Sequence, residues 1–272
     1  MLLLVTFALA SIVLSFITIF FTHMAETNPY NWFYMFLFTF GYFAIIITLG
    51  WGFLLLFSHK YKHKEYIDPR NNFYKGWTVF YIKFLLLFSW SKFKKKNFNR
   101  IPKNTPVLYL FNHQTLLDAY MILNSLYPRH FSMVATSKMK RVPFIGPLAT
   151  SLGCLYIDAN KPDSFRNIID TATDFIKNKN SSIVLSPEGF LNRDKELSHF
   201  KSGCFKIALN TNCPIVLLYF EGALELAKKK NLFKKVKLSA KVIDVIPPSE
   251  YENMNATELA KYTQEIYQNY RK

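Results

Sequence analysis

Acidic residues are scarce in this chain. Its 18 Asp and Glu are outnumbered by 34 Lys and Arg, which gives a formal net charge of +16. Such a basic chain usually binds nucleic acid or an anionic membrane surface. Half of the 272 residues are apolar, which excludes intrinsic disorder and allows a sizeable buried core.

Charge of either sign is almost absent from residues 1–58, where Glu26 is the single Asp, Glu, Lys or Arg. Residues 59–104, by contrast, hold twelve Lys or Arg against two acidic residues, so most of the excess positive charge lies there. A basic segment beside an uncharged one is typical of a membrane protein. We therefore expect anionic membrane lipids as a partner and no nucleic acid.

Cysteine is rare as well. Cys154, Cys204 and Cys213 form no C-x-x-C pair and are odd in number, so we expect reduced core residues. No His or Cys cluster has the spacing of a metal site, and we expect no bound metal or cofactor. The sequence contains no internal repeat and no low-complexity tract.

Two long uncharged runs, residues 1–22 and 32–57, each reach the roughly 20 residues that a helix needs to cross a bilayer. The linker between them, residues 23–31, lacks Lys and Arg, whereas basic residues begin directly after the second run. The positive-inside rule therefore predicts a transmembrane hairpin over residues 1–58 with the linker outside and the rest of the chain in the cytoplasm. This makes the protein integral to the cell membrane.

Two alternatives to a spanning hairpin were weighed. A cleaved signal peptide is disfavoured because no positive charge precedes the first run and no small-x-small site follows it. A hairpin that enters only one leaflet has the same length and composition and stays open.

Residues 59–104 are predicted to be a basic, partly interfacial membrane-proximal segment. Residues 77–90 form a third apolar run, but it has only fourteen residues with Lys83 in its middle, which favours an interfacial helix with aromatic anchors. The cations that follow would each contribute on the order of 1 kcal/mol against anionic lipid. The alternative is a solvated basic loop. These cations are Lys92, Lys94, Lys95, Lys96, Arg100 and Lys103.

Residues 105–272 are predicted to form an α/β domain with a largely parallel sheet flanked by helices. Near-continuous apolar runs predict buried strands, and an alternating run predicts a half-exposed one. Strands that alternate with helical segments favour a parallel sheet. The predicted strands are 106–111, 131–135, 154–157, 182–185, 214–220 and 237–246, and the helices are 114–126, 163–177, 201–210 and 257–270.

The first chemical motif directly follows the first predicted strand of this domain. His113 has a carboxylate, Asp118, five residues later. A carboxylate that accepts from one ring nitrogen leaves the other free to remove a proton from a hydroxyl. Because no Ser or Cys nucleophile lies beside His113, direct attack by a substrate hydroxyl is favoured over a covalent acyl-enzyme.

The second motif, Pro187-Glu188-Gly189, follows the strand predicted at 182–185. Proline and glycine here are explained by a tight turn, but the turn does not explain the glutamate. A carboxylate and a nearby guanidinium at the end of a sheet could hold the hydroxyls and phosphate of an acceptor.

Four motifs in this order resemble the glycerophospholipid acyltransferase family, most closely its 1-acylglycerol-3-phosphate (lysophosphatidic acid) acyltransferases. Asn112, His113 and Asp118 match the family's N-H-x4-D motif, and residues 187–189 match part of F-P-E-G-T-R. The second block and the later F-K-x-G and V-P-I-V segments are resembled by Lys138, Pro143, Gly146, Gly153, Leu155-Tyr156-Ile157-Asp158, Phe200-Lys201-Ser202-Gly203 and Cys213-Pro214-Ile215-Val216. The match covers roughly residues 101–222.

The resemblance implies that His113 is the general base, that Asp118 orients it, and that Glu188 and Gly189 help to form the acceptor site. The chain departs from the family where phosphate is expected to bind. Ser186 and Phe190 replace the usual Phe and Thr, the motif's Arg is absent two places after Gly189, and Ala159 and Asn160 stand where an Arg is usual. The candidates to compensate are Arg193, Lys138, Lys161 and Lys201.

We therefore expect an acyltransferase that moves a fatty acyl group from an acyl thioester, carried by coenzyme A or acyl carrier protein, to the free hydroxyl of a lysophospholipid. The expected acceptor is 1-acylglycerol 3-phosphate and the product is phosphatidic acid for phospholipid synthesis. The altered motifs leave glycerol 3-phosphate, another lysophospholipid or an amino-lipid open as acceptors. An inert membrane scaffold with the same fold is the non-enzymatic alternative.

Overall fold

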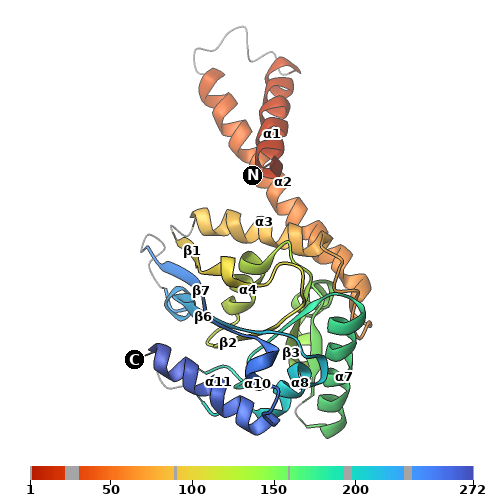
Figure 1. The fold of residues 1–272 in the computed structure, drawn as a ribbon. Helices are drawn as coiled ribbons and strands as arrows, with labels where there is room; N and C mark the ends of the chain where they lie inside the picture. Colours follow the sequence, from red (N-terminus) through yellow and green to blue (C-terminus); the bar gives the residue numbers. More distant parts are fainter. Residues whose placement is uncertain are drawn as a thin grey trace. The chain divides into compact units, whose positions relative to one another are not determined.

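The computed structural model describes residues 2–21, 31–88, 91–158, 160–192, 198–229 and 235–271 (Figure 1). The chain divides into two compact units, Met1–His59 and Lys60–Lys272, and each is described by itself.

The first unit is a pair of apolar helices, α1 (Leu2–Phe21) and α2 (Asn31–Ser58), which pack against each other. Polar side chains pair between them: the hydroxyls of Ser15 and Thr39 lie 2.8 Å apart, and those of Thr18 and Tyr42 lie 2.6 Å apart. Among the described residues one helix, Phe33–Tyr61, is long and apolar enough to cross a membrane, with a mean hydropathy of 2.1. The predicted turn at 23–31 falls almost wholly on residues 22–30, which lie outside the described residues.

The second unit is built around a seven-stranded sheet. Its order is β1-β7-β6-β2-β5-β3-β4. Strands β2, β3, β4, β5 and β6 are mutually parallel, β7 is antiparallel to β6, and β1 is parallel to β7. The strands are β1 (Lys92–Lys96), β2 (Leu108–Phe111), β3 (Phe131–Thr136), β4 (Leu155–Ile157), β5 (Ser182–Leu185), β6 (Ile215–Glu221) and β7 (Lys237–Ile246). The predicted α/β class with a largely parallel sheet is confirmed.

Helices cover the sheet, and the predicted helical segments are found with shifted ends. They are α3 (Phe73–Phe88), α4 (Leu117–Leu126), α5 (Ser137–Lys140), α6 (Ile145–Ser151), α7 (Pro162–Asn178), α8 (Lys206–Thr211), α9 (Ala223–Ala227), α10 (Pro248–Tyr251) and α11 (Ala256–Arg271). Short 3-10 helices are η1 (His59–Tyr61), η2 (Phe98–Arg100) and η3 (Ser202–Phe205). The helix predicted at 201–210 is therefore split into η3 and α8.

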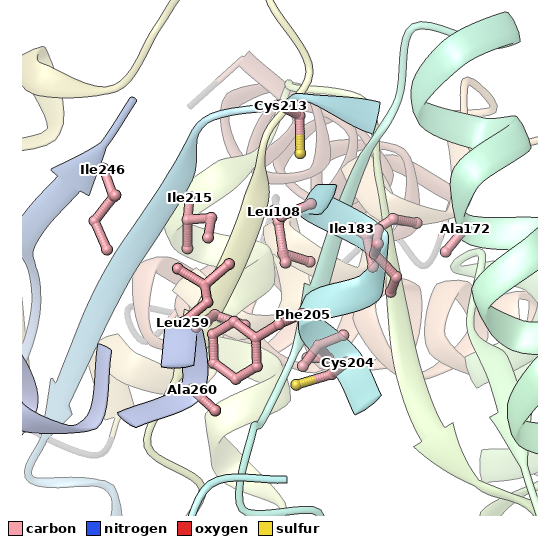
Figure 2. Close-up of a cluster of buried hydrophobic side chains, with 14 of the residues drawn as sticks. Leu108, Ala172, Ile183, Cys204, Phe205, Cys213, Ile215, Ile246, Leu259 and Ala260 are labelled. Atoms are coloured by element: carbon pink, nitrogen blue, oxygen red, sulfur yellow. The ribbon is translucent and has the colours of Figure 1, made fainter. Parts of the chain in front are cut away.

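The main core lies between the central strands and helices α7, α8 and α11. Figure 2 shows Leu108, Ile183 and Ile215 of three neighbouring strands facing Phe205, and none of these four side chains is exposed. Such strands are buried on both faces, which is why they appear in the sequence as unbroken apolar runs. All three cysteines are free and buried, as predicted.

The segment between residues 73 and 96 differs from the sequence expectation. Helix α3 begins at Phe73, packs against α4, and buries Val79, Phe80 and Ile82. These three side chains are covered by protein, so they cannot be the membrane anchors that the sequence suggested. The lysines that follow form β1, an edge strand rather than a loop. Lysine is a common protection of sheet edges against further pairing.

Candidate active site

His113 and Asp118 lie side by side just beyond the carboxyl end of β2. The Nδ1 of His113 is 2.9 Å from Oδ2 of Asp118. The same oxygen accepts hydrogen bonds from the backbone N–H groups of Gln114 (2.6 Å) and Thr115 (2.8 Å). The Asp118 side chain is 1% exposed and that of His113 is 25% exposed. The carboxylate is therefore fixed and buried, while the imidazole can be reached from outside the protein.

This arrangement fixes which nitrogen of His113 carries a proton. Oδ2 of Asp118 already accepts from two backbone donors, so it acts as an acceptor toward His113 as well, and Nδ1 must donate. Nε2 is left without its proton and can accept one from a hydroxyl. The pair has the geometry of a general base and its orienting carboxylate.

The local sequence explains why helix α4 begins later than predicted. The helix was expected from Gln114, but it begins at Leu117. The N–H groups of Gln114 and Thr115 turn toward the Asp118 carboxylate, and the Thr115 hydroxyl accepts from the N–H of Leu117 at 3.0 Å. Asp118 in the first turn thus shapes the loop that carries the base.

Asn112 locks the end of β2 to its neighbour β6. Its Nδ2 donates to the carbonyl of Phe220 at 3.0 Å, and its Oδ1 accepts from the Phe220 N–H at 2.7 Å. The side chain is 5% exposed. The sequence marks Asn112 as part of a motif but does not reveal this role, which depends on a contact 108 residues away.

Glu188 holds the loop after β5 instead of facing the cavity. Its side chain is 1% exposed. Oε2 accepts from Nδ2 of Asn192 at 2.6 Å and from the backbone N–H of Ser198 at 3.0 Å. The backbone N–H of Asn192 in turn donates to the carbonyl of His113 at 2.7 Å. The sequence does not predict this role for Asn192, whose only signal is a polar residue four positions after Glu188.

The base faces a large cavity beside the carboxyl ends of the central strands. Its volume is about 670 Å³, and it is lined mainly by apolar side chains. His113 lines it together with Ser186, Asp158 and the lysines Lys161 and Lys201. Apolar residues of its wall include Leu116, Met133, Leu148, Ile169, Phe190 and Ile207. The cavity is therefore polar near the base and apolar elsewhere.

The structure brings together two of the four predicted cations. Lys161 and Lys201 line the cavity, with Lys161 directly before α7. Lys201 lies against Gly189, because a Cβ built on that glycine would be 3.0 Å from Nζ. Lys138 is exposed on α5 and is not part of the lining, and Arg193 lies outside the described residues.

Two cysteines also line the cavity, but their environment makes them poor nucleophiles. Burial raises the pKa of the Cys154 and Cys204 thiols to about 12 in each case. A thiol with such a pKa is almost entirely protonated at neutral pH. Within the described residues, no group of three or more His, Cys, Asp or Glu side chains could hold a metal ion. Direct attack by an acceptor hydroxyl is the chemistry that this site supports.

Comparison with known proteins agrees with the motifs. Residues 92–221 match the family model described as Acyltransferase. Proteins named 1-acyl-sn-glycerol-3-phosphate acyltransferase from Limnanthes douglasii and Haemophilus influenzae are each 28% identical to this chain, over 163 and 174 residues. These matches cover 60% and 62% of this chain, and 57% and 71% of the two relatives. The chain thus spans little more than half the length of the first.

A solved structure shares the fold. The crystal structure of the 1-acyl-sn-glycerophosphate (LPA) acyltransferase PlsC from Thermotoga maritima superposes with a TM-score of 0.62 at 20% identity. The match covers 84% of this chain and 89% of that one. Residues 92–221, which contain the His113 and Asp118 pair and the loop that holds Glu188, therefore belong to the acyltransferase family, as the motifs had indicated.

Proposed function

We propose that this protein transfers a fatty acyl group from an acyl thioester to the free hydroxyl of 1-acylglycerol 3-phosphate, which makes phosphatidic acid. The observation that carries the proposal is the 2.9 Å contact between His113 Nδ1 and Asp118 Oδ2 at a largely apolar cavity. The names of the relatives from Limnanthes and Haemophilus support the same acceptor.

In the proposed reaction, Nε2 of His113 removes the proton of the acceptor hydroxyl as its oxygen attacks the thioester carbonyl carbon. The C–S bond then breaks, and the leaving thiolate takes the proton that His113 holds. Asp118 keeps the imidazole oriented and stabilises its charge while the proton is on Nε2. General-base catalysis of this kind contributes about 100-fold to 10,000-fold.

The cavity supports an amphipathic acceptor with an anionic group. Lys161 and Lys201 lie on the polar part of its wall and are proposed to bind the acceptor phosphate. The apolar part of the wall is proposed to hold an acyl chain. Glu188 and Gly189 act on the acceptor site indirectly, the first by holding the loop and the second by making room for Lys201.

We further propose that the protein is integral to the cell membrane through α1 and α2, with the acyltransferase domain on the cytoplasmic side. The length and apolarity of Phe33–Tyr61 support a membrane-spanning helix. Both the acceptor and the product are lipids, so a membrane tether keeps the enzyme with its substrates. The acyl donor is proposed to be acyl-coenzyme A or acyl carrier protein, which are soluble substrates, with no bound cofactor.

The test is release of free thiol by the purified full-length protein in lipid micelles. The acceptors to compare are 1-acylglycerol 3-phosphate, glycerol 3-phosphate, other lysophospholipids and an amino-lipid, each with acyl-coenzyme A and with acyl carrier protein. We expect the highest kcat/KM with 1-acylglycerol 3-phosphate. A different preferred acceptor would replace this assignment, and no thiol release with any acceptor would favour the inert scaffold.

His113→Ala should reduce thiol release by about 100-fold or more. His130→Ala is a matched control, because His130 is exposed and directly precedes β3, at the opposite edge of the sheet from the base. Equal activity of His113→Ala and the unmutated protein would contradict the proposed mechanism.

A further inference from the structure

Exposed apolar side chains of the second unit are not scattered. Ten large apolar side chains are exposed in the described part of residues 60–272, and seven of them lie in or beside the wall of the cavity. Single exposed apolar residues need no explanation, but a group of them marks an interaction surface. We name this group the apolar rim. It consists of Leu116, Tyr120, Val142, Phe144, Ile145, Phe190 and Leu191.

The apolar rim comes from three separate segments of the chain. Leu116 lies at the start of α4, Phe144 lies in the turn between α5 and α6, and Phe190 lies in the loop after β5. These side chains are 53%, 57% and 51% exposed. Five of the seven members also line the cavity, so the rim is continuous with the apolar wall inside.

The turn that carries Phe144 is strained. Phe144 has a φ of 61°, and the N–H of Ile145 donates to the carbonyl of Pro143 at 2.6 Å across it. A three-residue turn with positive φ is unfavourable for a bulky side chain. The ring gains little from protein packing in return, because more than half of it is exposed. Strain of this kind persists where it serves a function.

Cations directly precede this turn. Lys138, Lys140 and Arg141 lie within α5 or directly after it, and Lys140 Nζ lies 5.5 Å from the centroid of the Tyr156 ring. In the described residues none of the three forms an ion pair with a carboxylate. An apolar surface with free cations at its border is complementary to a bilayer that contains anionic lipid.

We propose that the apolar rim inserts into a leaflet of the bilayer, that Lys138, Lys140 and Arg141 bind anionic headgroups beside it, and that lipid therefore enters the cavity sideways from the leaflet. The occupant is a bilayer because the rim continues into an apolar cavity and the chain carries a helix long enough to span a membrane. The entry of an acceptor rests on the proposed function; the insertion of the rim does not.

Insertion is measured with a fluorescent label on the full-length protein in vesicles. Phe144→Cys gives a single exposed thiol, since Cys154, Cys204 and Cys213 are only 4%, 7% and 3% exposed. Vesicles contain phosphatidylcholine with or without phosphatidylglycerol, and brominated lipid quenches only a label within the bilayer. We expect strong quenching, and stronger quenching when phosphatidylglycerol is present.

The matched control is Asn178→Cys. Asn178 is exposed at the end of α7, and Lys161 at the other end of this helix lines the cavity, so the control lies roughly 25 Å from the cavity wall. We expect little quenching there. Weak quenching at both positions, or stronger quenching at 178 than at 144, would overturn the proposal. Burial of the label by an added acidic protein but not by lipid would assign the rim to a protein partner instead.

A second variant separates insertion from chemistry. Phe144→Gly removes the ring and relieves the positive φ, so it should fold, whereas Phe144→Leu keeps an apolar side chain; Phe144 does not line the cavity. We expect Phe144→Gly to lower turnover of a vesicle-borne acceptor about tenfold but not of a short-chain, monomeric one, and Phe144→Leu to restore it. Equal loss with both acceptors would overturn sideways entry. Absence of any turnover in the unmutated protein would refute the proposed function and leave the quenching result valid.

Discussion

The backbone N–H of Asn192 donates a 2.7 Å hydrogen bond to the carbonyl oxygen of His113. This contact joins the loop after β5 to the loop after β2, which are the two segments that carry the family motifs. The side chain of Asn192 also donates to the buried carboxylate of Glu188. Glu188 therefore acts on the base through the position of a loop.

Asn192→Ala should remove the side-chain bond to Glu188 and leave a buried carboxylate with one donor fewer. We expect a loss of unfolding free energy of about 1–3 kcal/mol and a lower kcat, because the loop that contacts His113 is less well held. Thermal unfolding and thiol release measure the two effects. Asn178→Ala, which removes a surface bond to Asp174, is the control and should change neither. Unchanged kcat in Asn192→Ala would show that the loop does not position the base.

Asp118→Asn should retain the fold and lose catalysis. The amide oxygen can accept the bonds from Gln114, Thr115 and His113, but the negative charge that stabilises the protonated imidazole is gone. We expect kcat to fall at least 100-fold with little change in KM. Steady-state kinetics and circular dichroism together test this. A large change in KM with unchanged kcat would place Asp118 in substrate binding instead.

Gly189→Ala should weaken binding of the acceptor phosphate. Gly189 has a φ of 76°, and an added Cβ would lie 3.0–3.2 Å from Nζ, Cε and Cδ of Lys201. The lysine must move, so KM should rise for an acceptor with a phosphate and change less for one without it. Lys201→Met should give the same pattern. Gly41→Ala is the control, since nothing lies within 4 Å of an added Cβ there. The same KM for Gly189→Ala and the unmutated protein would argue against a phosphate site at Lys201.

Lys75 should make the protein more stable as the pH rises through its folded pKa. The side chain is fully buried, with Nζ donating to the carbonyls of Pro69 and Phe131 at 2.7 Å each. Burial lowers its pKa from 10.5 to about 8. Between these values the folded state has lost the proton and the unfolded state keeps it, so higher pH favours folding, by up to about 3 kcal/mol.

The measurement is thermal unfolding between pH 7 and 10 for the unmutated protein, Lys75→Met and Lys83→Met. The Tm of the unmutated protein minus that of Lys75→Met should increase with pH. Lys83 is exposed on the same helix, so its variant should follow the unmutated protein. Parallel curves for all three proteins would show that Lys75 does not titrate in this range.

The native cysteines should resist thiol reagents. Cys154, Cys204 and Cys213 are buried, and burial raises the pKa of each thiol, to about 12 for the first two. We expect negligible reaction with a chromogenic disulfide at pH 8 and reaction of all three thiols after denaturation. Rapid reaction of one native thiol would show that the cavity wall opens to admit the reagent.

The segment from residue 73 to residue 96 shows where a linear pattern misleads. An apolar helix followed by lysines has the same pattern whether the helix lies on a membrane or packs on protein. The structure packs α3 against α4 and pairs the lysines of β1 with β7, whose partners lie about 145 residues further along the chain. Such long-range pairing leaves no periodic signal in β1 itself, because an exposed edge strand needs no apolar face.

The sequence by itself determined the apolar hairpin helices, the buried strands, the family and the base with its carboxylate. These features depend on short-range patterns: uncharged length, runs of apolar residues and a spacing of five between His113 and Asp118. Only the tertiary structure decided that Glu188 holds a loop, that Lys161 and Lys201 but not Lys138 line the cavity, and that the apolar rim surrounds it. Those outcomes depend on which distant segments the parallel sheet brings to one edge, and contacts between distant segments are not encoded in local spacing.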